Sequence, residues 1–258
     1  MDLGIAGIRV IITAGAGGIG LEIARAFLKE GARVEVCDVD AAALEALGET
    51  APGAVGTWCD VSDRTSVAAF MEGALGRLGG LDVLVNNAGI AGPTGRVDQI
   101  SPEDWDRTLA VDITGHFNVT RLAVPALKES ANASIIGLSS AAGRFGFPLR
   151  SPYAAAKWGV VGFIKSLAME LGEFGIRANA ILPGSVDGPR IRSVFENKAR
   201  ERNMSMEEVQ AMALSATSLK RLIPPQHLAN VAVFLSSPMG STISGQAIAV
   251  DGDMQMLV

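Results

Sequence analysis

The stretch "TAGAGGIG" at residues 13–20 connects an apolar run, "RVIIT" (9–13), to an amphipathic segment that ends at Gly31. In that segment Ile23 and Phe27 fall on one apolar stripe at helical spacing, and glycine is the usual residue just past a helix end. The stretch is therefore predicted to be a turn between a strand and a helix. Glycines in such a turn let a phosphate group approach the backbone and bind the amides at the start of the helix.

Five more apolar runs follow along the chain, separated by helical patterns. They are continuous in Val, Ile and Leu, which is typical of strands buried on both faces of a parallel sheet. Strands that alternate with helices predict right-handed crossovers and a doubly wound sheet. We therefore expect the α/β class: a single Rossmann-type domain over residues 1–258, with a mostly parallel seven-stranded sheet and helices on both faces. The runs are "RVEVC" (33–37), "LDVLV" (81–85), "SIIGL" (134–138), "RANAIL" (177–182) and "QAIAV" (246–250).

Two longer segments have helical patterns of their own. Residues 101–130 begin with Ser101, Pro102 and Asp104, which together make a favourable helix start. Residues 188–222 are highly charged and lie between the sixth run and the last helix pattern. Insertions at that place often form lids over a site, so we expect a helical substrate lid there; a solvated helical excursion is the alternative.

The composition argues against several classes of function. The chain has a net charge of −5 and no long basic run, so neither nucleic acid nor an anionic membrane surface is an expected partner. The N-terminus lacks a signal-peptide pattern, and the longest uncharged stretch, 228–250, is interrupted by Ser, Pro and Gly, unlike a membrane span. Cys37 and Cys59 suit small buried side chains in a reducing cytoplasm. His116 and His227 stand apart, so no metal site is expected.

The glycines of the turn fit two patterns. Gly15, Gly17 and Gly20 match G-x-G-x-x-G, whereas Gly18 and Gly20 match the tail of T-G-x-x-x-G-x-G with Ala14 in place of its first glycine. Either pattern inside a βαβ unit indicates a dinucleotide site, although a tight turn alone would also need glycines.

Asp38 follows the second predicted strand. A carboxylate at that position accepts hydrogen bonds from the ribose hydroxyls of NAD and repels a 2′-phosphate. No Arg or Lys in the glycine turn or directly after Asp38 reverses that preference. NAD is the predicted cofactor; an ordinary turn acid is the alternative interpretation of Asp38.

The only tyrosine of the chain, Tyr153, lies one helical turn before Lys157 in "SPYAAAK" (151–157). Residues four apart share a helix face, so the ammonium can lie beside the phenol. Lowering a phenol pKa by ~3 units takes ~4 kcal/mol, about what one charge ~4 Å away supplies at an effective dielectric constant of about 20. Such a pair makes a general base for an alcohol or a general acid for a carbonyl. Ser140, just past a predicted strand, can fix the reacting oxygen; Ser139 competes for that role, and a turn or capping serine is the alternative.

Together these residues resemble the short-chain dehydrogenase/reductase family in its short, single-domain form, over essentially the whole chain. "CDVS" (59–62), "NNAG" (86–89) and "LPG" (182–184) follow the glycine turn in the family's order. The resemblance implies hydride transfer between a substrate and nicotinamide. It implies that Ser140 orients the substrate oxygen, that Tyr153 exchanges the proton, and that Lys157 binds the nicotinamide ribose. The cofactor site that it implies comprises Gly15, Gly18, Ile19, Gly20, Asp38, Asp60, Val61, Asn87, Ala88, Gly89, Tyr153, Lys157, Pro183, Gly184 and Val186.

Three positions depart from the family pattern. Ala14 replaces a glycine, which is tolerable if Gly15 makes the tight turn. Asp112 stands where the family has an asparagine in its proton relay; it joins the predicted catalytic group, and a carboxylate near Lys157 would blunt the effect of that ammonium on the tyrosine. Gly188 replaces a threonine that touches the carboxamide of the cofactor.

Several arginines are predicted to surround the substrate. Arginines around a pocket mouth suit a carboxylate or another anion, so we expect a small polar hydroxy compound, with anionic and sugar-derived compounds included. Solvated surface arginines or subunit contacts are the alternative. The candidates are Arg144, Arg150 and Arg190, with Arg192, His116 and Phe147 nearby.

The predicted activity is NAD-dependent interconversion of a secondary alcohol and a ketone. NADH-dependent reduction of a 3-oxoacyl-type ketone is the alternative direction. A catalytically idle NAD-binding sensor is the alternative from another class, favoured by Asp112 and Gly188 and opposed by the intact Ser140, Tyr153 and Lys157. The resemblance also implies a homotetramer, with the apolar stretch 243–258 suited to a subunit contact or, in part, to a buried last strand.

Overall fold

The structure, a computed structural model, describes residues 3–257 and contains one seven-stranded sheet in the order β3-β2-β1-β4-β5-β6-β7. Every pairing is parallel, so the sheet is wholly rather than mostly parallel. The six apolar runs are confirmed as strands, and those at the centre of the sheet are buried along their whole length. The strands are β1 (Arg9–Thr13), β2 (Arg33–Asp38), β3 (Val55–Trp58), β4 (Val83–Asn86), β5 (Ser134–Leu138), β6 (Arg177–Pro183) and β7 (Ala247–Val250).

The strand that the sequence did not reveal is β3. It lies at the edge of the sheet and pairs only with β2. Its Val55 and Trp58 side chains are about half exposed, and Gly56 interrupts the run. A short, exposed edge strand therefore lacks the continuous apolar pattern that marks the buried strands.

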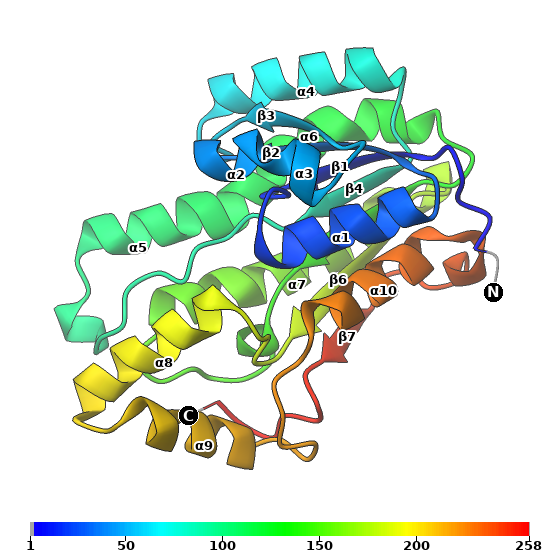
Figure 1. The fold of residues 1–258 in the computed structure, drawn as a ribbon. Helices are drawn as coiled ribbons and strands as arrows, with labels where there is room; N and C mark the ends of the chain where they lie inside the picture. The colour runs from blue at the N-terminus through cyan, green and yellow to red at the C-terminus, as the bar shows by residue number, and fades with distance from the viewer. Residues whose placement is uncertain (1–2, 258) are drawn as a thin grey trace.

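Helices cover both faces of this sheet (Figure 1). On one face α1 and α10 lie side by side and bury Ile23, Phe27 and Leu228 against β1, β2 and β4. On the other face α4, α6 and α7 bury side chains such as Phe70 and Ile164. The helices are α1 (Gly18–Lys29), α2 (Ala41–Glu45), α3 (Leu47–Thr50), α4 (Arg64–Leu78), α5 (Pro102–Leu109), α6 (Gly115–Lys128), α7 (Ser151–Glu170), α8 (Pro189–Arg202), α9 (Met206–Ser215) and α10 (Pro225–Ser236).

Two helical segments bear on the site. The predicted helix over 101–130 is divided into α5 and α6 by a π-helical turn, Ala110–Thr114. The segment 188–222 contains α8 and α9, which project beyond one end of the sheet in Figure 1. Within residues 3–257 no helix combines the length and the apolar character needed to cross a membrane.

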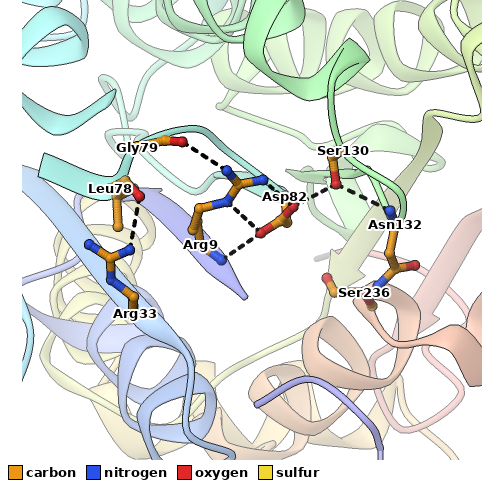
Figure 2. Close-up of polar contacts among 8 residues, drawn as sticks. All are labelled: Arg9, Arg33, Leu78, Gly79, Asp82, Ser130, Asn132 and Ser236. Atoms are coloured by element: carbon orange, nitrogen blue, oxygen red, sulfur yellow. Dashed lines mark hydrogen bonds and ion pairs between the residues drawn. The ribbon is translucent and has the colours of Figure 1, made fainter. Parts of the chain in front are cut away.

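The amino-terminal ends of the strands are tied together by a polar network (Figure 2). The Arg9 guanidinium donates two hydrogen bonds to the Asp82 carboxylate, at 2.7 and 2.8 Å, and Ser130 donates another at 2.6 Å. Arg9 also donates to the carbonyl oxygen of Gly79, just past α4, where a cation complements the helix dipole. In the same network Arg33 donates to the carbonyl of Leu78. This network therefore holds together the amino-terminal ends of the strands, at the opposite side of the sheet from their carboxyl ends.

The carboxyl end of β1 is the topological switch point of the sheet. The chain crosses from β1 to β2 and β3 on one side and then returns to β4 on the other. Ligands bind in the crevice outside the carboxyl ends at such a point. The glycine turn follows β1 and "NNAG" extends beyond β4, so both sequence motifs meet there.

Candidate active site

A cavity of about 350 Å³ opens at the carboxyl ends of β1, β2, β4, β5 and β6. Its volume falls in the range of small-molecule and cofactor sites. The predicted residues that line it are Gly18, Ile19, Asp38, Asn87, Gly89, Ser140, Phe147, Arg150, Tyr153, Lys157, Pro183, Gly184, Val186 and Arg190. Gly15, Gly20, Ala88, Asp60, Val61, Asp112, His116, Arg144 and Arg192 lie outside this lining.

The glycine turn follows the second of the two patterns. Ala14 and Gly18 have positive φ angles of 49° and 52°, and a Cβ atom on Gly20 would lie 2.1 Å from the carbonyl oxygen of Ala14. The expectation that Gly15 takes over the tight turn is wrong, because Ala14 itself adopts the left-handed conformation. Gly15 is required for another reason: its Cβ would lie 2.6 Å from Cβ of Val36.

The start of α1 is suited to an anion. Gly17 is the N-cap residue and supplies no capping side chain, so the first amides of α1 remain available for a pyrophosphate. Gly17, Gly18 and Ile19 line the cavity. This end of the cavity therefore fits the phosphates of a dinucleotide.

Asp38 is held in place by the backbone at the end of β2. Its carboxylate accepts hydrogen bonds from the amides of Ala16 and Asp40, both at 3.1 Å. Asp40 and Ala43 line the same end of the cavity. Two carboxylates and no described Arg or Lys thus face the position that the ribose of an adenosine would take.

The "NNAG" segment is fastened to the glycine turn. The side-chain amide of Asn87 donates to the carbonyl oxygens of Thr13 and Ala14, and the amide of Ala88 donates to Oγ1 of Thr13. Gly89 lies so near the lysine that a Cβ on it would be 3.0 Å from Nζ of Lys157. This segment therefore brings the two motifs to one wall of the cavity.

Asp60 and Val61 belong to a neighbouring region. The Asp60 carboxylate accepts hydrogen bonds from the amide and hydroxyl of Ser62, and Val61 is buried. The resemblance places both residues in the cofactor site, but neither belongs to the lining of the cavity.

Of the two candidate serines, Ser140 has the hydroxyl that faces Tyr153. Ser139 is buried and donates a 2.8 Å hydrogen bond to the carbonyl of Lys157, so its hydroxyl supports the backbone of α7. Ser140 accepts a hydrogen bond from the amide of Ala142, and its hydroxyl lowers the pKa of Tyr153. The geometry therefore favours Ser140 as the group that holds a reacting oxygen beside the phenol.

Lys157 lies beneath Tyr153 on the same face of α7. Its ammonium is 5.7 Å from the centroid of the Tyr153 ring, donates to the carbonyl of Leu138 at 3.1 Å, and is 3% exposed. Burial raises the pKa of Tyr153, but the charges of Arg190 and then Lys157 act in the opposite direction. Together with the hydrogen bond from Ser140, they hold the pKa of this phenol below its ordinary value.

Asp112 lies in the π-helical turn between α5 and α6 and is fully buried. One carboxylate oxygen accepts a 2.7 Å hydrogen bond from the amide of Ile90, and the other is 3.7 Å from Nζ of Lys157. Its negative charge raises the pKa of Tyr153. The Asp112 carboxylate therefore opposes the effect of Lys157 on the pKa of Tyr153, as the sequence analysis expected. π-Helical turns of this kind occur frequently at functional sites.

His116 is buried below the lysine. Burial, and then the charge of Lys157, lower its pKa to about 3, so the imidazole is neutral at physiological pH. Its Nε2 lies 3.3 Å from the carbonyl of Ala88. His116 therefore supports the "NNAG" segment rather than reaching the substrate.

The predicted arginines separate into two groups. Arg150 and Arg190 line the cavity beside Tyr153. Arg144 does not; its guanidinium forms a 2.9 Å ion pair with Asp251, so its predicted place in the substrate pocket is wrong. Arg192 pairs at the surface with Asp187.

The sequence analysis missed two residues that line the cavity and one buried cation near it. Met254 and Leu257 line it from the C-terminal segment, although that segment was assigned to a subunit contact or to a buried strand. Their place after β7, at the carboxyl edge of the sheet, is the signal that identifies them. Lys198 of α8 is buried with its ammonium 4.1 Å from the centroid of the Phe147 ring, and burial followed by the charges of Arg202 and Arg150 lowers its pKa to about 7.

No group of three or more His, Cys, Asp or Glu side chains within residues 3–257 is arranged to hold a metal ion. Cys37 and Cys59 are both buried and reduced. Beside Tyr153 the cavity is lined by the hydroxyl of Ser140, the ammonium of Lys157 and the guanidinium groups of Arg150 and Arg190.

Comparisons with known proteins agree with this geometry. A family model described as enoyl-(acyl carrier protein) reductase matches residues 14–255. The chain is 38% identical over 248 residues to 3-oxoacyl-[acyl-carrier-protein] reductase of Thermotoga maritima, covering 95% of this chain and 96% of that protein. Two solved structures superpose on it with a TM-score of 0.90. Levodione reductase is 30% identical and covers 96% of this chain and 97% of its own; an actinorhodin polyketide ketoreductase with NADPH is 34% identical and covers 95% and 96%.

Proposed function

The chain belongs to the short-chain dehydrogenase/reductase family, and from that premise we propose that it interconverts a secondary alcohol and a ketone with NAD as its cofactor. As a member of this family it is an oxidoreductase of hydroxyl or ketone substrates that binds a nicotinamide cofactor. The observation that carries the proposal is the meeting of Ser140, Tyr153 and Lys157 in one cavity with the glycine turn.

In the proposed mechanism each side chain has one task. The bound cofactor supplies the acceptor of hydride for oxidation or its donor for reduction. Ser140 holds the substrate oxygen by a hydrogen bond, and the phenolic oxygen of Tyr153 takes the proton of an alcohol or gives one to a carbonyl. The Lys157 ammonium stabilises the tyrosinate and is the group expected to bind the nicotinamide ribose.

A single substitution tests the enzyme assignment. Tyr153→Phe removes the proton-exchanging oxygen and keeps the ring, so turnover is expected to fall below detection while cofactor binding persists. The measurement is NADH absorbance with a panel of secondary alcohols and ketones. Full turnover by the Phe variant contradicts the assignment. Cofactor binding by the wild-type protein without turnover across the panel favours the NAD-binding sensor instead.

Asp38 and Asp40 support NAD over NADP. A 2′-phosphate at this end of the cavity would meet two carboxylates and no cation, whereas ribose hydroxyls can donate to Asp38. We expect kcat/KM for NAD to exceed that for NADP at least about tenfold, a difference of about 1.4 kcal/mol, and Asp38→Ser to reduce the difference. Equal or better turnover with NADP would exclude this part of the proposal; the ketoreductase with NADPH is the counter-example within the family.

The proposed substrate is a small polar hydroxy compound or its ketone, because two guanidinium groups line the cavity beside Tyr153. Reduction of a 3-oxoacyl-type ketone is the second candidate, since the similar proteins described above are reductases. The same side chains serve both directions. Rates of alcohol oxidation and ketone reduction on matched pairs of compounds at one pH distinguish the two.

We also propose that residues 188–222 form a lid over the substrate. Ile191 and Val194 of α8 belong to the lining of the cavity, which supports this role. Hydrogen exchange of the α8 amides is expected to slow when cofactor and substrate analogue bind together. Unchanged exchange would argue for a solvated helical excursion.

We further propose a cytoplasmic homotetramer that acts on a small molecule rather than on nucleic acid or a membrane. Exposed apolar side chains on successive helices, among them Trp105, Phe117 and Trp158, support subunit contacts, and the buried reduced cysteines suit a reducing compartment. The molar mass from light scattering tests the assembly; a monomer mass would reject it.

A further inference from the structure

Tyr153 is surrounded by positive charge. Three cationic groups lie within 6 Å of the centroid of its ring, at 5.1 Å (Arg150), 5.7 Å (Lys157) and 5.8 Å (Arg190). Asp112 is the carboxylate that acts on the phenol in the opposite sense. A phenol in such a setting is stabilised as its anion.

The three cations do not act equally. Lys157 is paired with Asp112 at 3.7 Å, and both side chains are almost fully buried. The field of a close ion pair falls off faster than that of a single charge, so the carboxylate cancels part of the effect of the lysine on the phenol. The expectation that the lysine alone tunes the tyrosine is therefore incomplete.

Arg150 is also limited in what it can do. Its guanidinium donates to the carbonyl of Ala91, its Nε has no acceptor among the described residues, and the side chain is 2% exposed. Burial lowers the pKa of Arg150, which means that its charge is already held at a cost. Its position is fixed by the Phe147 and Tyr153 rings on which it stacks.

Arg190 differs from both. It stands at the start of α8 and donates a 3.0 Å hydrogen bond from Nη1 to the carbonyl of Gly89, which aims its guanidinium across the cavity toward Tyr153. None of the ion pairs found within residues 3–257 includes Arg190. Unlike the charge of Lys157, the charge of Arg190 is therefore not compensated by a carboxylate within ion-pair distance among these residues.

We propose that Arg190 is a positioning residue that, through its charge and its anchor on Gly89, sets the acidity of Tyr153. The proposal rests on the proposed role of Tyr153 in proton exchange. It assigns a residue of α8, outside the Ser140, Tyr153 and Lys157 set, to the proton-transfer step. It also makes the acidity of the phenol depend on where α8 lies, because Arg190 moves with that helix.

The electrostatics of the site agree with this assignment. After the opposing effect of burial, Arg190 contributes the largest effect on the pKa of Tyr153, ahead of Lys157, Ser140 and Asp112. Arg190 is solvent-exposed, so salt and water screen part of its charge. Two further charged groups lie near this part of the cavity: Asp187, which lines it, and Lys198 of α8, whose ammonium lies over the Phe147 ring that contacts the Tyr153 ring edge-on.

The sequence offers a direct measurement of this acidity. Tyr153 is the only tyrosine of the chain, so the ultraviolet absorbance of tyrosinate reports its ionisation alone, without substrate or cofactor. Arg190→Gln is expected to move the titration midpoint toward alkaline pH by about one unit. Arg190→Lys, which keeps the charge, is expected to restore most of the difference.

Arg192→Gln is the matched control, since Arg192 lies on the same helix and pairs at the surface with Asp187. It is expected to titrate like the wild-type protein, and Tyr153→Phe supplies the blank. Coincident titrations of the wild-type protein and Arg190→Gln would overturn the proposal. So would an equal shift in Arg192→Gln.

Kinetics supply the second readout. Oxidation requires the ionised phenol, so Arg190→Gln should lower kcat for alcohol oxidation about tenfold at neutral pH and approach the wild-type rate at alkaline pH. An equal loss at every pH, with an unmoved tyrosinate titration, would assign Arg190 to substrate binding or structure and overturn the proposal. Because the spectroscopic titration needs no turnover, it stands or falls independently of the proposed NAD-dependent activity.

Discussion

Ala14 adopts a backbone conformation that costs an alanine about 1–2 kcal/mol. Its methyl group packs partly against the core, which repays about 0.8 kcal/mol or less. Ala14→Gly is therefore expected to stabilise the protein by about 0.5–1 kcal/mol in urea unfolding. Ala26→Gly, within α1, is the control and should destabilise by about the same amount. A loss of stability in Ala14→Gly would show that the turn is not strained.

Asp112→Asn tests the electrostatic field at Tyr153 by removing a negative charge, whereas Arg190→Gln removes a positive one. The amide oxygen can still accept the hydrogen bond from Ile90, while the negative charge beside Lys157 disappears. Because that charge raises the pKa of Tyr153, the tyrosinate titration should move toward acidic pH, and oxidation at neutral pH should rise about two- to threefold. A shift toward alkaline pH would contradict this electrostatic account.

At the scale of residues, the sequence predicted those parts of the site in which the chemistry requires a particular type of residue. Tyr153 and Lys157 lie together because a spacing of four on a helix allows nothing else. The choice between Ser139 and Ser140 depended on which hydroxyl the α7 backbone engages, and a serine pair alone does not carry that information. Arg144 and Arg150 differ in partners rather than in sequence context, so only the fold could separate them.

Among the elements, the C-terminal segment after β7 forms one wall of the cavity. Asp251 holds this segment: its Oδ1 accepts hydrogen bonds from the amides of Asp253 and Met254, and its Oδ2 pairs with Arg144 at 2.9 Å. Asp251 is almost fully buried in this arrangement. The ion pair therefore positions Met254 against the substrate space.

Arg144→Met should leave the charge of the buried Asp251 carboxylate without its cation, while Oδ1 keeps its hydrogen bonds from two backbone amides. We expect a loss of about 2 kcal/mol in urea unfolding and a higher KM for charged and neutral substrates alike. Adding Asp251→Asn removes the stranded charge and should recover part of the stability, which a double-mutant cycle measures. A rise in KM confined to anionic substrates, with unchanged stability, would instead return Arg144 to the substrate pocket.

The elements that sequence patterns predicted least well are those set by tertiary context. The edge strand β3 carries exposed side chains and a glycine, and the π-helical turn at 110–114 inserts a residue into a continuous helical pattern. Neither changes the apolar periodicity enough to be seen. Gly188 illustrates the same limit: its φ of 151° disfavours the threonine that the family pattern places there.

Across the whole molecule, the sheet has two sides with different tasks: the side where the strands end, here called the carboxyl edge, and the side where they begin, here called the amino edge. The carboxyl edge carries the cavity, where Tyr153 and its cations hold charge at a cost in stability. The amino edge carries the Arg9–Asp82 network, in which both oxygens of the Asp82 carboxylate accept hydrogen bonds from Arg9 and one also accepts from Ser130 (Figure 2). Separation by the length of the buried strands allows one edge to be stabilised without altering the other.

Asp82→Asn tests this division. Burial raises the pKa of Asp82, but hydrogen bonds from Arg9 and Ser130 outweigh it and hold that pKa below its usual value. A carboxyl whose folded pKa is depressed contributes stability above its unfolded pKa of about 3.9, and the contribution is lost as pH falls through the folded value. The variant should therefore be about 2 kcal/mol less stable than the wild-type protein in urea at neutral pH, and the difference should vanish in strong acid.

Asp98→Asn, which removes an exposed pair at 3.7 Å, is the control and should leave the stability unchanged. NADH affinity should be the same in all three proteins, and a weaker affinity in Asp82→Asn would show that the two edges are not independent. An equal stability difference at both pH values would contradict the role given to the ionised Asp82 carboxylate.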